Sequence, residues 1–356
     1  MSACRVPIVN LQTFVGAILR RAGVREDVAE AVAQGLTQAS LRGVDSHGVR
    51  LLPHYVAGVK GGRINPDPTY RFRRTSSSTG VLDADHTFGH AAGLDAARHA
   101  VALAQEAGTG QVAVRNSSHF GAAAYFALEI AKHDMIGLCF SSTDALIRTH
   151  GGTRPFLGNN PLCLAAPCDG EEPVCLDMAT SVVTFNRIRQ WRDAGERLPA
   201  GVAADGTGRE TEDPCAVASL LPIGGYKGYG LSLAIEILCS LLTGMPYGPH
   251  IPKMFEAPLS EQRRLGQFVA AWRIDCFEEP AQFKRRLAQL IGELRAEPRM
   301  EAEVPVQVAG DPEKRAAEER RRLGIPLSRR EFDALNALAR EAGLPLLDVQ
   351  ETVEVV

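Results

Sequence analysis

Apolar residues recur every three to four positions through the first sixty residues, the period of an α-helix with one buried face. In the first such stretch the apolar residues are Leu11, Phe14, Val15 and Ile18. The pattern predicts helices over residues 11–21, 26–41 and 45–59, with Gly23 beyond the first and Gly61 beyond the third. We therefore expect a small helical domain at the N-terminus.

The middle of the chain alternates between strand-like and helix-like patterns. Short apolar runs predict strands over residues 79–83, 111–115, 136–141, 162–167 and 174–178. Helical periodicity predicts helices over residues 91–105 and 121–133. Strands mixed with helices indicate an α/β or α+β sheet domain, and the alanine, valine and cysteine in the strands indicate that both faces are covered.

The last third combines loops with charged helices. Glycine, proline and acidic residues predict loops over residues 192–214 and 243–258. Further helices are predicted over residues 231–242, 280–298, 311–322 and 329–341, the last opened by the capping-box pattern of Ser328 and Glu331. We expect three regions: an N-terminal helical domain (1–75), a sheet domain (76–300) and a C-terminal helical segment (301–356) that packs back on the first.

Composition narrows the possible partners. The chain has 356 residues, 45% hydrophobic and 23% charged, with a formal net charge of -3, so nothing suggests a nucleic acid or a membrane surface as partner. We see no signal peptide. The eight cysteines show no paired framework, which predicts reduced, mostly buried thiols and a cytoplasmic protein. His86 and His90 make a poor metal pair because Gly89 separates them, and we expect no metal.

The first candidate for chemistry is Ser46 beside His47. Histidine exchanges a proton near neutral pH, and the positive end of a helix dipole favours its neutral form. The competing interpretation is that Asp45 or Ser46 merely caps a helix. Arg50 and His54 follow at helical spacing, so Arg50 is either a carboxylate ligand beside His47 or a surface arginine.

Two glycine-containing segments can bind anions. His119 lies in a turn over residues 116–121 between a predicted strand and a helix, where backbone N–H groups can hold a pyrophosphate; a plain turn is the alternative. Lys227 lies among four glycines in residues 221–230, ahead of a helix. That segment matches neither a Walker A loop nor the Rossmann glycine pattern, and a flexible loop with a solvated lysine is its alternative.

Two weaker segments complete the candidates. Asn159 and Asn160 form a tight turn before Pro161, and their amides can bond a substrate. Asp177 ends a predicted strand, where it can orient a histidine, meet a ribose hydroxyl, or simply cap the strand.

Taken in order, these motifs resemble the malate/L-lactate dehydrogenase family of NAD(P)-dependent oxidoreductases, which is distinct from the Rossmann-type enzymes. The resembling segments are GVDSHGVRLLPHY (43–55), GGRINP (61–66), SHFG (118–121), GNNP (158–161), LDMATS (176–181) and LPIGGYKGYG (221–230). The resemblance implies a non-Rossmann α/β fold with a mixed, largely antiparallel sheet and helical parts at both ends. It also implies a homodimer that transfers hydride between NAD or NADP and C2 of a 2-oxo or 2-hydroxy acid, or of a cyclic imino acid.

The same resemblance implies roles for individual residues. Its catalytic residues are Ser46, His47, His119 and Asp177, and its substrate residues are Arg50, His54 and Asn160. Its cofactor-binding residues are His119, Phe120, Gly121, Ser141, Asp177, Met178, Ala179, Lys227, Gly228 and Gly310. We favour His47 as proton donor, with His119 as the alternative.

The chain departs from the family pattern at several positions. Leu51 stands where many members have arginine, Asn186 and Arg187 stand where glycine and lysine are usual, and Ala309 replaces a proline. These departures indicate a nonstandard substrate. They also keep two other classes open: a metal-independent lyase or isomerase that uses the same histidine, and a non-catalytic descendant of the family.

Overall fold

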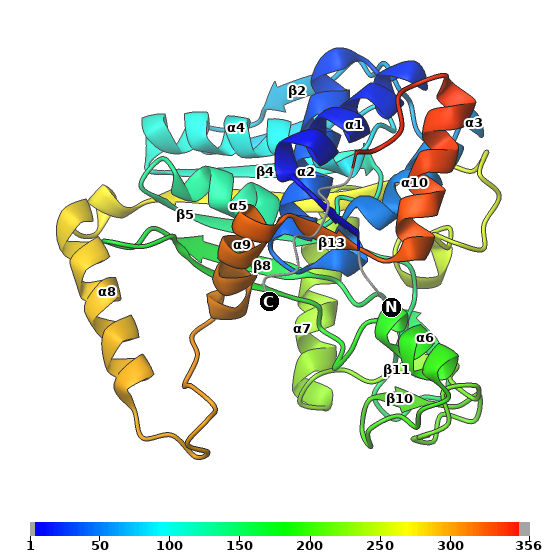
Figure 1. The fold of residues 1–356 in the computed structure, drawn as a ribbon. Coiled ribbons are helices and arrows are strands. Elements are labelled where there is room, and N and C mark those ends of the chain that lie inside the picture. Colours follow the sequence, from blue (N-terminus) through cyan, green and yellow to red (C-terminus); the bar gives the residue numbers. More distant parts are fainter. Residues whose placement is uncertain (1–3, 349–356) are drawn as a thin grey trace.

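Within residues 4–348, which the computed structural model describes, a seven-stranded sheet forms the centre of the molecule (Figure 1). Its strands, in spatial order, are β2 (Arg71–Arg74), β3 (Thr79–Asp83), β4 (Thr109–Ser117), β12 (Leu265–Arg273), β5 (Met135–Ser141), β8 (Leu162–Ala166) and β9 (Val174–Met178). Strands β3 and β4 run parallel, and the other neighbours are antiparallel. The expected mixed, largely antiparallel sheet is therefore confirmed.

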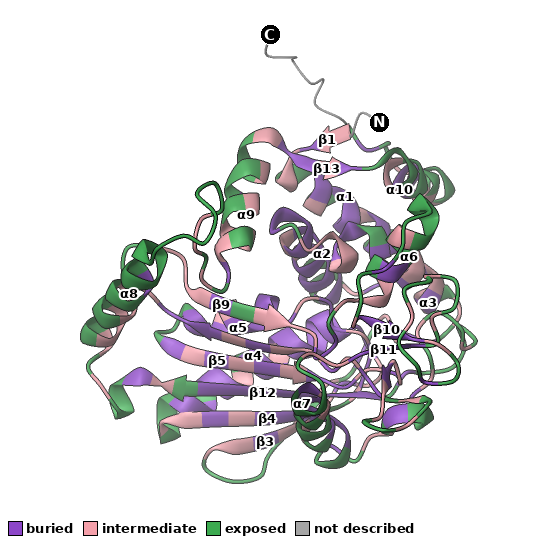
Figure 2. Ribbon diagram, turned by 90° about the horizontal axis from the view of Figure 1, so that it is seen from below, coloured by how far each residue is buried: buried purple, intermediate pink, exposed green. Residues whose placement is uncertain are grey.

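Helices cover both faces of this sheet. Helices α4 (Gly89–Ala107) and α5 (Ala124–Ala131) pack on one face, whereas α7 (Tyr226–Glu236) and a π-helix (Ile237–Leu241) lie on the other, nearer the viewer in Figure 2. Alternate strand residues face opposite sides, so Val112 and Val269 join one hydrophobic cluster while Ala113 and Phe268 join another. Helix α4 lies so close to β4 that a Cβ on Gly110 would come within 1.9 Å of the Ala100 carbonyl oxygen.

The two ends of the described chain meet. Helices α1 (Ile8–Arg21), α2 (Glu26–Leu41) and α3 (Leu52–Lys60) form the N-terminal part. Strand β1 (Cys4–Val6) pairs antiparallel with β13 (Ile325–Leu327). Helix α9 (Asp311–Leu323) contacts α2, and α10 (Arg329–Ala342), which begins with the capping box, contacts α1 and α3. One hydrophobic cluster extends from the N-terminal helices through the sheet to α10.

A smaller layer lies beside one end of the main sheet. It contains β10 (Ala203–Ala204), β11 (Ser219–Leu220), β6 (Ile147–Arg148), β7 (Pro155–Leu157) and helix α6 (Phe185–Ala194). Its own hydrophobic cluster includes Ile147, Ile188 and Leu220. Helix α8 (Pro280–Ala296) projects from the opposite end of the molecule (Figure 1).

Three predictions from the sequence are wrong in detail. The helix expected over residues 45–59 is two 3-10 turns, Asp45–His47 and Val49–Leu51, followed by α3. The helix expected over residues 231–242 begins at Tyr226 and gives way to the π-helix after Glu236. All eight cysteines are free, but only Cys139, Cys163, Cys175 and Cys239 are buried.

The sequence also gave no indication of β12, which is the central strand of the sheet. No helix within residues 4–348 is long and apolar enough to cross a membrane.

Candidate active site

A cavity of about 640 Å³ opens between the N-terminal helices, the sheet and α6. Ten of the predicted site residues line it: Ser46, His47, His119, Phe120, Gly121, Ser141, Asp177, Met178, Ala179 and Gly310. They come from segments far apart in the chain, so the fold assembles a single site from motifs that the sequence shows only separately.

The turn that carries His47 is held by its neighbours. A Cβ on Gly48 would lie 2.1 Å from Ser40 Oγ, so only glycine lets the chain pass α2 this closely. The Val49 backbone N–H donates to Ser40 Oγ at 3.1 Å. Arg320 of α9 donates to both carboxylate oxygens of Asp45, at 2.6 and 2.9 Å. Asp45 therefore links the turn to α9, and its side chain caps no helix.

Two histidines stack inside the cavity. The rings of His47 and His119 lie 5.5 Å apart at an interplanar angle of 23°. Each is oriented through Nδ1: Ser46 Oγ lies 2.8 Å from His47 Nδ1, and the Tyr55 hydroxyl oxygen lies 2.7 Å from His119 Nδ1. The hydrogen bond to Nδ1 fixes each ring and leaves Nε2 on the opposite edge for a ligand.

Both imidazoles are neutral at pH 7. Burial, followed by the charge of Arg50, lowers the pKa of His47 to about 4. Burial lowers the pKa of His119 well below its usual value, and the neighbouring His47 and His90 lower it further. The sequence attributed the neutral form of His47 to a helix dipole. Because His47 lies in a short 3-10 turn, burial is the actual cause.

Asp177 occupies another wall of the cavity, at the end of β9. Its Oδ2 accepts a hydrogen bond from the Ala124 N–H at 2.8 Å, at the start of α5. Burial raises its pKa to about 6, an effect that the Ala124 N–H partly opposes. A carboxyl with a raised pKa inside a cavity is typical of a functional group.

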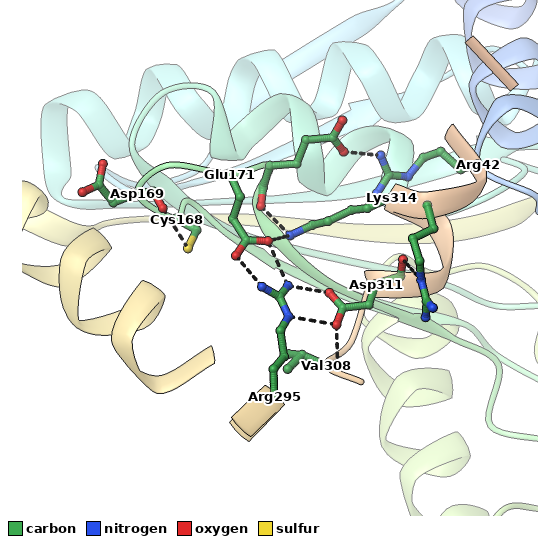
Figure 3. A network of polar contacts seen from close by, with 10 residues as sticks. Arg42, Cys168, Asp169, Glu171, Arg295, Val308, Asp311 and Lys314 are labelled. Atoms are coloured by element: carbon green, nitrogen blue, oxygen red, sulfur yellow. Dashed lines mark hydrogen bonds and ion pairs between the residues drawn. The ribbon is translucent and has the colours of Figure 1, made fainter. Parts of the chain in front are cut away.

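An ion-pair network holds Asp311 (Figure 3), the residue that follows Gly310 of the cavity lining. Arg295 of α8 donates to Asp311 at 2.6 Å and to Glu171 at 2.9 Å. Lys314 donates to the Glu171 carboxylate at 2.6 Å. Gly310 has a φ of +95°, and a Cβ there would lie 3.1 Å from the Cys175 carbonyl oxygen. This position therefore favours glycine for the sake of the fold itself, and its cofactor contact stays a prediction.

Five predicted residues do not line the cavity: Arg50, His54, Asn160, Lys227 and Gly228. Arg50 and Lys227 are exposed. The ring of His54 lies 4.9 Å from that of Phe255, which lines the cavity.

Asn160 is fully buried, and its Nδ2 donates to Glu236 at 2.6 Å. Glu236 also accepts from the Gly248 N–H at 2.8 Å and from Ser240 Oγ at 3.1 Å. These bonds join the start of β8 to α7, so the geometry indicates a structural role for Asn160.

Sequence reasoning missed several residues of the site. Tyr55 belongs to the GVDSHGVRLLPHY motif but was not singled out, although its spacing of eight residues from His47 offered a signal. Arg263 and Asp144 form a buried ion pair at 2.6 Å in the cavity wall. Nothing local marks that pair, because its partners are far apart in the sequence and Arg263 precedes the unpredicted strand β12.

Comparisons with known proteins bear on the family and the fold of the chain. A family model described as malate/L-lactate dehydrogenase matches residues 6–336. The chain is 37% identical over 355 residues to a malate dehydrogenase of Pyrococcus abyssi, covering 97% of each chain. It is 34% identical over 243 residues to a Δ1-pyrroline-2-carboxylate/Δ1-piperideine-2-carboxylate reductase of Pseudomonas putida, covering 67% of this chain and 71% of that one. The crystal structure of a malate dehydrogenase from Entamoeba histolytica superposes with a TM-score of 0.92 at 31% identity, covering 97% of this chain and 99% of that one.

Proposed function

Because the chain belongs to the malate/L-lactate dehydrogenase family of oxidoreductases, we propose that it transfers hydride between a nicotinamide cofactor and C2 of a 2-oxo or 2-hydroxy acid. The observation that carries this proposal is the pair of neutral, stacked imidazoles in the cavity, each held through Nδ1. An acid/base group of this kind contributes about two to four orders of magnitude to a proton-coupled reaction.

The cavity residues fit a dinucleotide. The volume of about 640 Å³ lies within the usual range for cofactor sites. Arg42 lines the cavity, and its buried Nη2 has no hydrogen-bond partner within the described chain. An unpartnered guanidinium nitrogen suits a phosphate oxygen. We propose that Arg42 and the backbone near Gly121 and Gly310 hold the phosphates and that Asp177 accepts from a ribose hydroxyl. When bound, the nicotinamide ring donates or accepts the hydride.

We propose that His119 carries the proton. The pKa of Tyr55 is raised by burial, so its hydroxyl keeps its proton and can pair with either neutral tautomer of His119. In alcohol oxidation, Nδ1 of His119 holds the ring hydrogen, and Nε2 accepts the proton of the substrate hydroxyl. In reduction the imidazolium returns that proton to the substrate oxygen. His47, favoured by the sequence pattern, stacks on His119 and is the second candidate for this role.

We propose that the protein is a homodimer that pairs through α7 and the π-helix after it. The side chains of Leu233, Ile237, Leu241 and Leu242 are 42–59% exposed on this face. Figure 2 shows α7 on the face of the sheet turned to the viewer, opposite α4 and α5. A contiguous apolar surface of this kind is typical of a protein interface. Light scattering coupled to size exclusion tests the dimer, and Ile237→Asp is expected to yield monomers.

We also propose NAD or NADP as the cofactor and the cytoplasm as the location. The eight free thiols support a reducing compartment. Lys227 and Gly228 lie outside the cavity. We propose them as cofactor contacts only if the proposed dimer brings them to the cavity of the partner subunit.

A second candidate function is reduction of a cyclic imino acid. It is supported by the similarity to the Pseudomonas putida reductase, whose name states such substrates. A ring C=N next to a carboxylate requires the same hydride acceptor carbon and the same proton donor as a 2-oxo acid does.

The decisive experiment is a substrate panel. Reduced NAD and NADP are mixed with 2-oxo acids, with and without methylamine or ammonia, and with Δ1-pyrroline- and Δ1-piperideine-2-carboxylate. Loss of cofactor absorbance measures turnover, and nicotinamide fluorescence measures binding. Turnover with at least one of these compounds is expected. Absence of both turnover and cofactor binding would instead indicate a lyase, an isomerase or a non-catalytic protein.

A further inference from the structure

Arg263 is an unusual arginine because it is buried and only partly paired. Its residue exposure is 3%. One nitrogen, Nη2, donates to Asp144 Oδ1 at 2.6 Å. Its Nε and Nη1 have no hydrogen-bond partner within the described residues. Leaving buried N–H groups of a charged side chain unpaired is costly, so this arrangement is expected where a ligand supplies the missing acceptors.

The buried positive charge around Arg263 also exceeds the buried negative charge there. Arg63 is also buried. Burial lowers the pKa of both guanidinium groups, the Asp144 carboxylate opposes this at both, and the charge of Arg63 lowers the pKa of Arg263 further. Among the residues that the structure describes, Arg63 donates to backbone carbonyl oxygens alone, including those of Met254 at 2.7 Å and Ala257 at 2.6 Å. Two buried guanidinium groups therefore face one buried carboxylate. Glu261 offsets part of this charge, but it is exposed to solvent, where its effect is screened.

Arg263 lies beside the proposed proton carrier. It lines the same cavity as His119. After burial, His47 and His90, its charge adds to the lowering of the His119 pKa, and it opposes the rise in pKa that burial causes at Tyr55. In a 2-oxo acid the carboxylate is bonded directly to the carbon that receives hydride. The group that holds this carboxylate must therefore share the cavity with the acid/base imidazole, and Arg263 lines the same cavity as His119.

Three other arginines are less suited to this task. Arg50 is exposed outside the cavity, and the cavity wall carries the apolar Leu51 next to it. Arg42 donates to Glu172 at 2.8 Å and acts on Asp177, at a different wall. Arg189 lies over the ring of Phe255 at 5.2 Å.

We propose that Arg263, held by Asp144, is the residue that binds the carboxylate of the substrate and selects 2-oxo or 2-imino acids over their neutral analogues. The proposal rests on the proposed function for the identity of the substrate, but not for the presence of an anion site. It also explains the role of Arg63, which fixes the segment leading into Arg263 by bonding four of its carbonyl oxygens.

The test compares oxamate, a 2-oxo-acid analogue, with oxamide, its neutral counterpart of similar size. Binding to the full-length protein is measured by calorimetry, with and without reduced cofactor. The wild type is expected to bind oxamate at least tenfold more tightly than oxamide. Arg263→Met is expected to weaken oxamate binding about 100-fold and to leave oxamide and cofactor binding unchanged.

Two further variants serve as a conservative substitution and as a control. Arg263→Lys preserves the charge opposite Asp144 and is expected to weaken oxamate binding about tenfold, because lysine cannot supply the remaining planar donors. Arg264→Met removes an exposed neighbouring arginine and is expected to change nothing. Folding of each variant is checked by thermal unfolding and by cofactor fluorescence.

The outcomes separate this proposal from the proposed function. Equal binding of oxamate and oxamide by the wild type, or unchanged oxamate affinity in both Arg263 variants, overturns the role of Arg263 even if the enzyme reduces 2-oxo acids. Selective oxamate binding that depends on Arg263, in a protein that oxidises no reduced cofactor, supports the anion site and rejects the oxidoreductase.

Discussion

Replacing Asp177 by asparagine measures two effects of the buried carboxylate separately: its cost to the stability of the fold and its contribution to cofactor binding. The substitution keeps the shape of the side chain, and an asparagine oxygen can still accept the hydrogen bond from Ala124 N–H, which measures 2.8 Å in the wild type. What it removes is a negative charge that burial disfavours. We therefore expect Asp177→Asn to stabilise the protein at neutral pH and to weaken cofactor binding.

The magnitude follows from the pKa. The folded value is about 6 and the unfolded value is 3.8, so the folded pKa is raised. A raised carboxyl pKa costs nothing below the unfolded value and costs progressively more stability as the pH rises towards the folded value. The full penalty above pH 6 is at most about 3 kcal/mol, and about half of it is present at pH 5. It is an upper limit because Asp177 lines the cavity and is partly exposed.

The assay is urea unfolding of wild type and Asp177→Asn at pH 8 and at pH 5, without cofactor. The free energy of unfolding of the variant is expected to exceed that of the wild type by up to about 3 kcal/mol at pH 8 and by about half as much at pH 5. Fluorescence titration with reduced cofactor is expected to show about tenfold weaker binding, because a charge-assisted hydrogen bond becomes a neutral one.

Two results would refute this reasoning at different points. Equal stability of the two proteins at pH 8 would show that the Asp177 carboxylate is not desolvated in the folded state. A stabilised variant with unchanged cofactor affinity would show that the carboxylate takes no part in binding the ribose, and the role of Asp177 would then be structural.

Tyr55→Phe removes the hydroxyl that pairs with His119 Nδ1. We expect kcat to fall about 10- to 100-fold while cofactor affinity stays unchanged. A variant with the kcat of the wild type would contradict the role of that hydrogen bond. His119→Asn is expected to lower kcat by about two to four orders of magnitude and His47→Asn by less; the reverse order in the same absorbance assay would make His47 the proton carrier. Since the pKa of His119 is lowered, its imidazolium is scarce at pH 7. The rate of reduction is therefore expected to fall as the pH rises through the neutral range, while the rate of oxidation stays level. Stopped-flow rates that change with pH by the same slope in both directions would argue against His119 as proton carrier. Asn160→Leu deprives the buried Glu236 of its 2.6 Å donor and is expected to cost about 1.5–3 kcal/mol of stability, and an unchanged urea midpoint would show that the remaining donors suffice.

The sequence by itself determined most of the secondary structure and the chemical type of the site. Helical periodicity located α1, α2, α4 and α5, and the capping box located the start of α10. Short apolar runs located the strands of the main sheet apart from β12 and β2, because these strands bury one face or both. The ordered motifs indicated the family. The individual residues Ser46, His47, His119 and Asp177 stood out because polar groups interrupt apolar runs at the ends of predicted elements.

Only the tertiary structure decided how those groups meet. The stack of His47 on His119, the Tyr55 hydroxyl at His119 Nδ1 and the Arg263–Asp144 pair each join positions separated by more than sixty residues. No local pattern encodes such contacts. The lowered histidine pKa values and the raised pKa of Asp177 likewise come from burial, which depends on how the N-terminal helices, the sheet and α6 close around one cavity. The chain carries the reactive groups in its sequence, and packing decides their protonation and their neighbours.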